Sequence, residues 1–112
     1  MDTFCKGGTE TGSVRTQILM EANENITGQR ERDYGTPENN FSIIANLWTD
    51  YIGARVTALD VSMMMCLLKI ARVKSGGGSG DSFVDIAGYA ACGGEIRECQ
   101  ECMETERERL TK

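Results

Sequence analysis

Two charged residues stand inside otherwise apolar segments, and they are the first candidates for chemistry. Lys69 lies in the middle of VSMMMCLLKIARV (61–73), and Asp85 lies in FVDIAGYAACGG (83–94). Burying an unpaired charge is costly, so each side chain needs a partner or a ligand. Two interpretations stay open: the residues form a core ion pair with each other, or they belong to a ligand site.

The spacing around these residues predicts a site for phosphate and metal. On a helix, Lys69 and Arg72 share a stripe with Ser62 and Met65, and two cations there would grip a phosphate. Asp81 and Asp85 are four residues apart, so together they could hold Mg²⁺ against a phosphate. The alternative to a ligand site is structural: Arg72 points into solvent at the end of its helix, Asp81 caps the next helix, and Asp85 forms a salt bridge.

The segment QRERDYGTPENN (29–40) is polar and has no helical periodicity, and its part before the cap at Thr36 is predicted to be a loop. Its candidate binding residues are Arg30, Arg32, Asp33 and Tyr34. Arginine forks suit phosphates, and a tyrosine ring can stack on a base. The loop precedes a predicted helix start at Thr36, and helix N-termini attract anions. The alternative is a solvated charged loop.

Other catalytic patterns are weak. Glu21 and Glu24 look like half of a carboxylate metal site, but helical projection turns them to different sides, which favours a solvated face. The chain contains no His, so no nucleophile can be activated by one. No phosphate-binding loop or dinucleotide fingerprint occurs.

Four helices are predicted to position these residues. The first begins near Ser13 and ends at Thr27-Gly28, with an apolar stripe at Val14, Ile18, Leu19, Ala22 and Ile26. The second follows Thr36-Pro37, a good cap, and ends at Gly53, with a stripe at Phe41, Ile44, Ala45, Trp48, Tyr51 and Ile52. The third opens at a capping box, Thr57 with Asp60, and ends near Ser75. Because it is apolar all round, it is expected in the middle of the bundle.

The fourth helix is predicted from Asp81 or Ser82 to about Leu110. Gly88, Gly93 and Gly94 in its first half imply the close approach of another helix. Its second half carries a thin apolar seam, which could pack on the first helix or on a second subunit; the surrounding charges favour self-association. The seam consists of Tyr89, Cys92, Ile96, Cys99, Met103 and Leu110.

The predicted fold class is all-α, a four-helix bundle-like single domain that forms a homo-oligomer. Residues 1–12 are expected to be a disordered N-terminus. Residues 13–112 are expected to form the helical domain, with a Gly/Ser loop at 75–80 and a charged helix extension at 95–110.

Composition excludes several partners. The 112 residues include 17 acidic and 12 basic side chains, a net charge of -5, which argues against duplex nucleic acid. No apolar run reaches the ~18 residues of a membrane span, and no signal peptide is visible, so a cytoplasmic protein is expected. The five cysteines are expected to be reduced, with Cys66 and Cys92 in the core.

Three blocks, DYGTPENNFSIIANLW, ALDVSMMMCLLKIARVKSG and DSFVDIAGYAACGGEI, resemble a family of small phage and prophage proteins of unassigned function over residues 14–97. More distantly, the order of DYG, K-x-x-R and D-S-x-x-D-x-x-x-Y is similar to the phage nucleotide modification associated domain. That domain is in turn similar to the all-α MazG-like nucleoside triphosphate pyrophosphohydrolases. The resemblance implies a location in the host cell cytoplasm and a ligand site at matching positions: Asp33, Tyr34, Gly35, Lys69, Arg72, Asp81, Asp85 and Tyr89.

The MazG-like enzymes hold Mg²⁺ with ExxE and ExxD pairs. Here Glu21 and Glu24 face apart, and Asp81 and Asp85 are spaced by four instead of three. The favoured function is therefore binding of a nucleotide or cyclic nucleotide, either to sequester a host-defence signal or to act on a nucleotide pool. No cofactor is assigned from the sequence, and Mg²⁺ is the candidate. The alternatives are a Mg²⁺-dependent pyrophosphohydrolase and an inhibitor of a host factor that acts by protein interaction.

Overall fold

The computed structural model describes residues 12–76 and 80–111, and within these the side chains at 29–30, 101–109 and 111 are not described. The described chain is helical and contains no strand, which confirms the predicted all-α single domain. Its helices are α2 (Val14–Ile26), α3 (Gln29–Tyr34), α4 (Pro37–Ile52), α5 (Ala58–Ser75) and α6 (Asp81–Thr111). The predicted disordered segment 1–12, apart from Gly12, and residues 77–79 of the predicted Gly/Ser loop at 75–80 lie outside the described residues. Ser75 of that loop is the last residue of α5.

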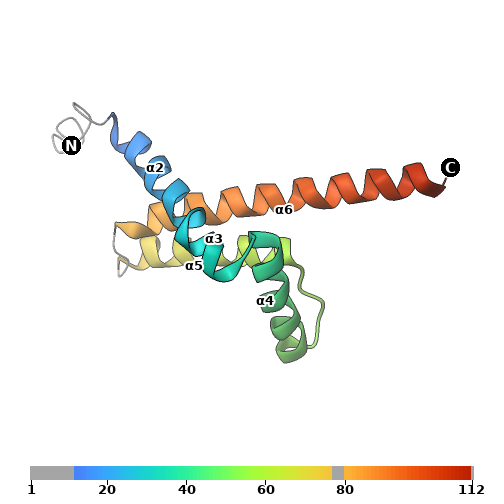
Figure 1. Cartoon of the computed structure of the whole chain (residues 1–112). Helices are drawn as coiled ribbons and strands as arrows, with labels where there is room; N and C mark the ends of the chain where they lie inside the picture. Colours follow the sequence, from blue (N-terminus) through green and yellow to red (C-terminus); the bar gives the residue numbers. More distant parts are fainter. Residues whose placement is uncertain (1–11, 77–79, 112) are drawn as a thin grey trace.

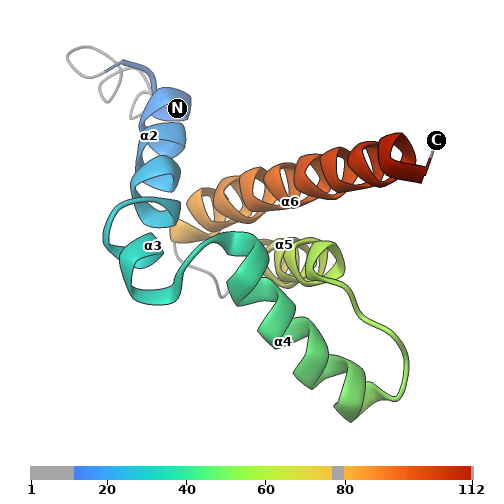
Figure 2. The same ribbon diagram turned by 45° about the vertical axis from the view of Figure 1, so that its right-hand side comes forward.

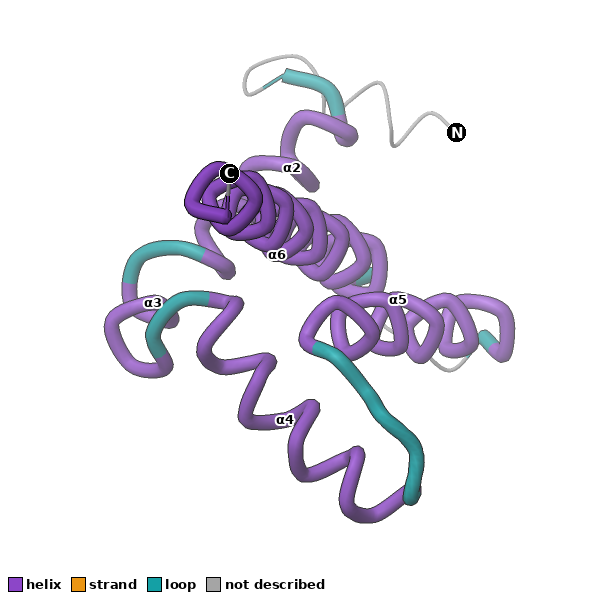
Figure 3. Tube along the Cα trace, turned by 90° about the vertical axis from the view of Figure 1, so that its right-hand side faces the viewer, coloured by secondary structure: helices purple, strands orange, loops and turns teal. Residues whose placement is uncertain are grey.

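The arrangement is built on an antiparallel pair, α5 and the first half of α6 (Figure 1). Helix α2 packs on α6, and α4 packs on α5 and more lightly on α6 (Figure 2). The second half of α6 extends beyond the other helices, and the view along α6 shows α4 and α5 diverging from their point of contact (Figure 3). The overall dimensions are 58 × 32 × 25 Å. None of the described helices combines the length and the apolar character that a membrane crossing requires.

Local signals set the helix ends as predicted. The Thr36 hydroxyl accepts from Asn39 N at 3.4 Å, and Pro37 occupies the first helical position of α4. Thr57 and Asp60 form both bonds of the capping box, with Asp60 N donating to the Thr57 hydroxyl at 3.1 Å and Thr57 N donating to Asp60 Oδ2 at 3.0 Å. The Ser13 hydroxyl oxygen caps α2 by accepting from Thr16 N at 3.2 Å.

The prediction of a loop at QRERDYG is wrong, because Gln29–Tyr34 forms the short helix α3. Glycines at both ends make this possible: Gly28 has φ 64° and Gly35 has φ 82°. Positive φ lets the backbone turn sharply out of α2 and again before α4 at little steric cost. A helix of six residues is too short to show an apolar period, so the sequence pattern missed it.

The core lies where α4, α5 and α6 meet. It contains Phe41 and Ala45 from α4, Ala58 and Val61 from α5, and Cys92 and Ile96 from α6. Two glycines of α6 allow neighbouring helices to approach, as predicted. A Cβ on Gly88 would lie 3.1 Å from Ile26 Cγ2 of α2, and a Cβ on Gly93 would lie 3.1 Å from Met63 Cε of α5. A Cβ on Gly94 would meet nothing within 4 Å, so packing does not explain that glycine.

Helix α5 does not lie in the middle of the molecule, contrary to the prediction. Only Ala58, Val61 and Ser62 of this helix are buried. The reason is that α6 and α4 pack on one side of α5, and its composition cannot show that the opposite side has no neighbour. Exposed apolar residues also include Leu19 of α2 and Tyr51 and Ile52 of α4, which the predicted stripes had placed inside.

The first half of the α6 seam packs within the chain and not on a second subunit. Cys92 is 5% and Ile96 is 0% exposed, and Tyr89 packs against the same core. These residues face α4 and α5, which pack against the first half of α6. Beyond that half, the side chain of Met103 is not described, and Leu110 is 87% exposed.

Candidate functional site

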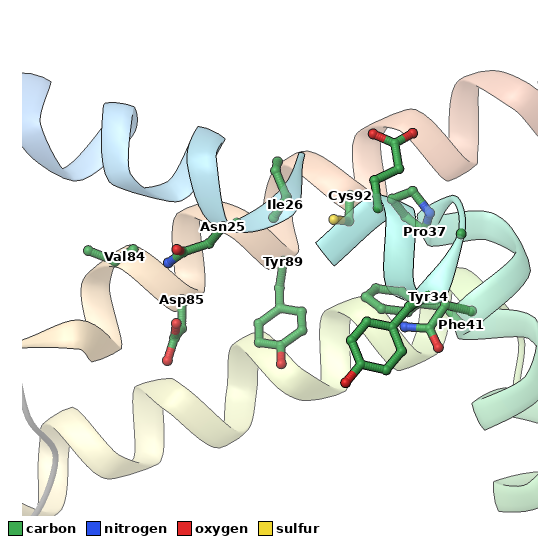
Figure 4. Close-up of a pocket in the computed structure, with 13 residues that line it drawn as sticks. Asn25, Ile26, Tyr34, Pro37, Phe41, Val84, Asp85, Tyr89 and Cys92 are labelled. Atoms are coloured by element: carbon green, nitrogen blue, oxygen red, sulfur yellow. The ribbon is translucent and has the colours of Figure 1, made fainter. Parts of the chain in front are cut away.

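A pocket of about 570 Å³, measured with its open mouth, lies where α2, α3, α4 and α6 meet (Figure 4). Every one of these helices contributes to the lining, and α3 and the turn at Gly35 close one end of it. The lining residues are Asn25, Ile26, Glu31, Tyr34, Gly35, Pro37, Asn40, Phe41, Val84, Asp85, Gly88, Tyr89 and Cys92.

The floor of the pocket is apolar and well packed. Phe41 and Val84 are each 4% exposed, and Cys92 beside them is buried as well. The ring of Phe41 lies 6.1 Å from that of Tyr89, tilted by 37°. This is the separation of an ordinary aromatic pair, so the two rings hold each other in place. Gly88 adds no side chain and leaves room above the floor.

The rim of the pocket is polar and acidic. Asn25 and Asn40 bring amides, Glu31 and Asp85 bring carboxylates, and Tyr34 brings a phenol. In Figure 4, Asp85, Tyr89 and Tyr34 follow one another along the pocket, with Asp85 at one end and Tyr34 at the other. No Lys or Arg is among the lining residues. The pocket therefore suits a planar ring with donors on its edge better than it suits a phosphate.

Lys69 and Asp85 form an ion pair, with Lys69 Nζ 3.0 Å from Asp85 Oδ2. The ion pair is thus present that was one of the two interpretations of Lys69 and Asp85. The side chains are 20% and 33% exposed, so the pair lies at the edge of the pocket and not in a sealed core. The Lys69 ammonium is the cation that borders the acidic end of the pocket.

The structure brings together part of the predicted site. Tyr34, Asp85 and Tyr89 line the pocket, and Lys69 touches it through Asp85. The remaining predicted residues with described side chains are exposed and lie outside the lining: Arg32, Asp33, Arg72 and Asp81. The side chain of Arg30 is outside the described residues.

The two predicted metal ligands, Asp81 and Asp85, have no third candidate ligand beside them among the described residues. Among them, no three His, Cys, Asp or Glu side chains come close enough to hold a metal ion. Asp85 is engaged with Lys69, and Asp81 is exposed at the start of α6. Glu21 and Glu24 are both exposed on α2, in agreement with the predicted solvated face.

Sequence reasoning missed several pocket residues. Asn25, Glu31 and Asn40 come from three helices, and none of them stands out by type or spacing. Phe41 was expected only as a core residue. The sequence offered one indication for Asn40: it lies one turn after the capped start of α4 and close to the candidate residues of the DYG segment.

Of the two cysteines predicted in the core, Cys92 is buried there and Cys66 is only half-buried. Cys66 Sγ lies 3.7 Å from the carbonyl oxygen of Ile86, to which it donates across the α5–α6 contact. Burial raises the pKa of the Cys66 thiol above its ordinary value of 9.0. A raised pKa disfavours the thiolate, which is the reactive form. The contact with Ile86 places the Cys66 thiol between α5 and α6, whereas Cys92 lies in the pocket floor.

Comparison with known proteins places the chain among phage relatives. Residues 17–97 match the family described as Domain of unknown function (DUF6378). The Gene 55 protein of Mycobacterium phage D29 is 47% identical over 81 residues, which cover 72% of this chain and 54% of that protein. The Gene 55 protein of Mycobacterium phage L5 is 51% identical over 74 residues, 65% of this chain and 47% of that protein. The chain thus spans about half the length of these relatives. No solved structure gives a significant match.

Proposed function

Since this chain belongs to the DUF6378 family, a domain of unknown function with phage members, we propose a function from the pocket itself: it binds a nucleotide, with the nucleoside in the pocket. The observation that carries the proposal is the combination of aromatic rings and amides. Tyr34, Phe41 and Tyr89 surround a cavity whose rim offers the amides of Asn25 and Asn40. Bases stack on aromatic side chains, and Asn amides pair with the edge of adenine.

The charges of the site favour one orientation of the ligand. Glu31 and Asp85 would accept hydrogen bonds from an exocyclic amine or a ribose hydroxyl, but they would repel a phosphate. The phosphate then lies beyond Asp85, next to Lys69. Arg72 is three residues further along α5 and shares a face with Lys69, so it supplies a second cation at this end.

Retention of the ligand, and not its hydrolysis, is the activity that we propose. The described residues gather no cluster of three acidic, His or Cys side chains, and the resemblance to MazG-like enzymes lacks their complete carboxylate pairs. In a protein with phage relatives, retention would sequester a host-defence signalling nucleotide or alter a nucleotide pool. The protein is expected to work in the host cytoplasm and as a homo-oligomer.

The test is to incubate the purified chain with Mg²⁺ and a mixture of nucleoside triphosphates, cyclic dinucleotides and ADP-ribose derivatives. Chromatography then compares the solution with the protein after denaturation. A nucleotide that leaves solution and returns intact on denaturation supports the proposal. Conversion to monophosphate and pyrophosphate would replace it with the hydrolase. If no nucleotide binds at up to millimolar concentration, the proposal fails, and interaction with a host protein becomes the leading function.

Two exposed tyrosines provide a matched pair of variants. Tyr34 lines the pocket and is 61% exposed, whereas Tyr51 is 93% exposed on α4, away from the lining. Replacing either one by alanine removes little packing. Loss of a stacked ring costs about 1–3 kcal/mol, so Tyr34→Ala should weaken nucleotide affinity about 5- to 150-fold. Tyr51→Ala should leave it unchanged. Equal effects from the two variants would exclude this pocket as the base site.

A further inference from the structure

The outward face of α5 is apolar although it lies in solvent in the single chain. Leu67 is 63%, Ile70 is 47%, Met63 is 42% and Met64 is 38% exposed. The helices that pack on α5 are α6 and α4. Met63, at the edge of the face, reaches α6 at Gly93, and Leu67, in the middle of the face, is the most exposed of the four. Contiguous apolar surface of this kind marks an interaction site.

The residues on this face form a pattern that is complementary to itself. The apolar positions Met63, Met64, Leu67, Ile70 and Ala71 follow the spacing of a helix seam. An acid, Asp60, precedes them by one turn, and a base, Lys74, follows them by one turn. Leu67 is the centre of the series, because Asp60 lies seven residues before it and Lys74 seven residues after it.

We propose that two copies of the chain pair through this face, with their α5 helices antiparallel about a two-fold axis at Leu67. The symmetry brings Asp60 of each copy opposite Lys74 of the other, and Met64 opposite Ile70. Leu67 meets its own counterpart, as a two-fold interface requires. A parallel pair would instead place Asp60 against Asp60 and Lys74 against Lys74. The charges therefore select the antiparallel orientation, which the opposed helix dipoles also favour.

This pairing is compatible with the pocket but independent of it. Lys69 lies on the side of α5 that faces α6, where it binds Asp85. It is therefore not part of the outward face. The dimer can form whether or not a nucleotide binds, so failure of one proposal leaves the other standing.

The first test is the mass of the full chain in solution by sedimentation equilibrium. The expected mass at micromolar concentration is twice 12.3 kDa. Leu67→Lys puts like charges face to face at the axis and should raise the dimer dissociation constant at least about 100-fold. Leu19 is the matched control, because it is also 63% exposed but lies on α2. Leu19→Lys should leave the mass unchanged. A folded wild-type monomer, or equal effects from the two variants, would overturn the proposal.

The second test addresses the orientation. Lys74→Glu places two acids opposite each other in the antiparallel dimer and should raise the dissociation constant about tenfold. High salt should remove most of this effect, because it screens exposed charges. In a parallel pair the same change only replaces a repelling Lys–Lys contact by a Glu–Glu contact, so no change in affinity would overturn the antiparallel arrangement. Arg15→Glu on α2 is the charge-matched control and should have no effect.

Discussion

Substitution of Gly93 by alanine should destabilise the fold, because this glycine lies at a close contact between α5 and α6. Gly93 is buried, and a Cβ built on it would overlap the hydroxyl oxygen of Ser62. It would also lie 3.1 Å from Met63 Cε. Ser62 is held in place, because its hydroxyl donates to the carbonyl oxygen of Leu59 at 3.2 Å and the residue is 0% exposed.

The magnitude follows from two opposing contributions. Inserting a methyl group into a packed contact costs about 1–3 kcal/mol. Alanine gains about 1 kcal/mol over glycine within a helix. The flexible end of Met63 could move away from the new methyl group, but Ser62 is short and buried and cannot. The packing cost is therefore expected at the upper end of this range. The net loss in the free energy of unfolding is then about 1–2 kcal/mol, or roughly 4–16 °C in Tm.

The neighbouring Gly94 is the matched control. A Cβ there would meet nothing within 4 Å, so Gly94→Ala should stabilise the protein by up to about 1 kcal/mol through helix propensity alone. Urea unfolding followed by circular dichroism, at one fixed protein concentration, measures both variants. Adding Ser62→Ala to Gly93→Ala removes the overlapping oxygen and should recover part of the loss. If Gly93→Ala is as stable as Gly94→Ala, the close helix contact is refuted.

Three further predictions concern other parts of the chain. Thr57→Ala removes the hydroxyl that caps α5 and should lower the free energy of unfolding in urea by about 1 kcal/mol. Thr57→Ser keeps a hydroxyl and should lose much less stability. Equal losses in the two variants would show that the hydroxyl does not cap the helix. Lys69→Met breaks the half-exposed ion pair with Asp85 and should change stability by less than about 1 kcal/mol. The same variant should weaken binding of a nucleoside monophosphate but not of the nucleoside, and an equal loss for both would remove Lys69 from the phosphate end. Because burial raises the pKa of Cys66, the folded state keeps a proton that the unfolded chain releases above the ordinary pKa of 9.0. This contribution to stability is complete below that pH and is lost as the pH rises further. Cys66→Ser should therefore lose less stability than the wild type between neutral pH and about pH 10, and identical pH profiles would contradict the raised pKa.

The helix ends were determined by the sequence because capping is a local interaction. Thr36 with Pro37, and Thr57 with Asp60, each make their bonds within one turn of the chain. The hydrogen bonds that end a helix depend on the type of a few adjacent residues and not on the rest of the fold. The pairing of Lys69 with Asp85 was predicted on equally general grounds, because a charge in an apolar segment requires a counterion.

Burial along the helices was predicted only in part. The apolar sequence of α5 shows that this helix avoids water, but not whether its own chain or a second copy covers it. Tyr51 lies on the stripe predicted for α4 and is nevertheless 93% exposed, because α5 crosses α4 elsewhere. The amino-acid composition of a helix gives its hydrophobicity, whereas its burial depends on which other helix or subunit packs against it.

The pocket was decided by the tertiary structure. Tyr34, Asp85 and Tyr89 were candidates from their types and positions, but Asn25 and Asn40 were not, because an asparagine on a helix carries no signal of its own. Their amides line one pocket because α2 and α4 both contact α6, with Gly88 allowing α2 to come close. Sequence thus determined where each helix begins and ends, while the helix crossings determined which side chains share a cavity and which apolar face stays open.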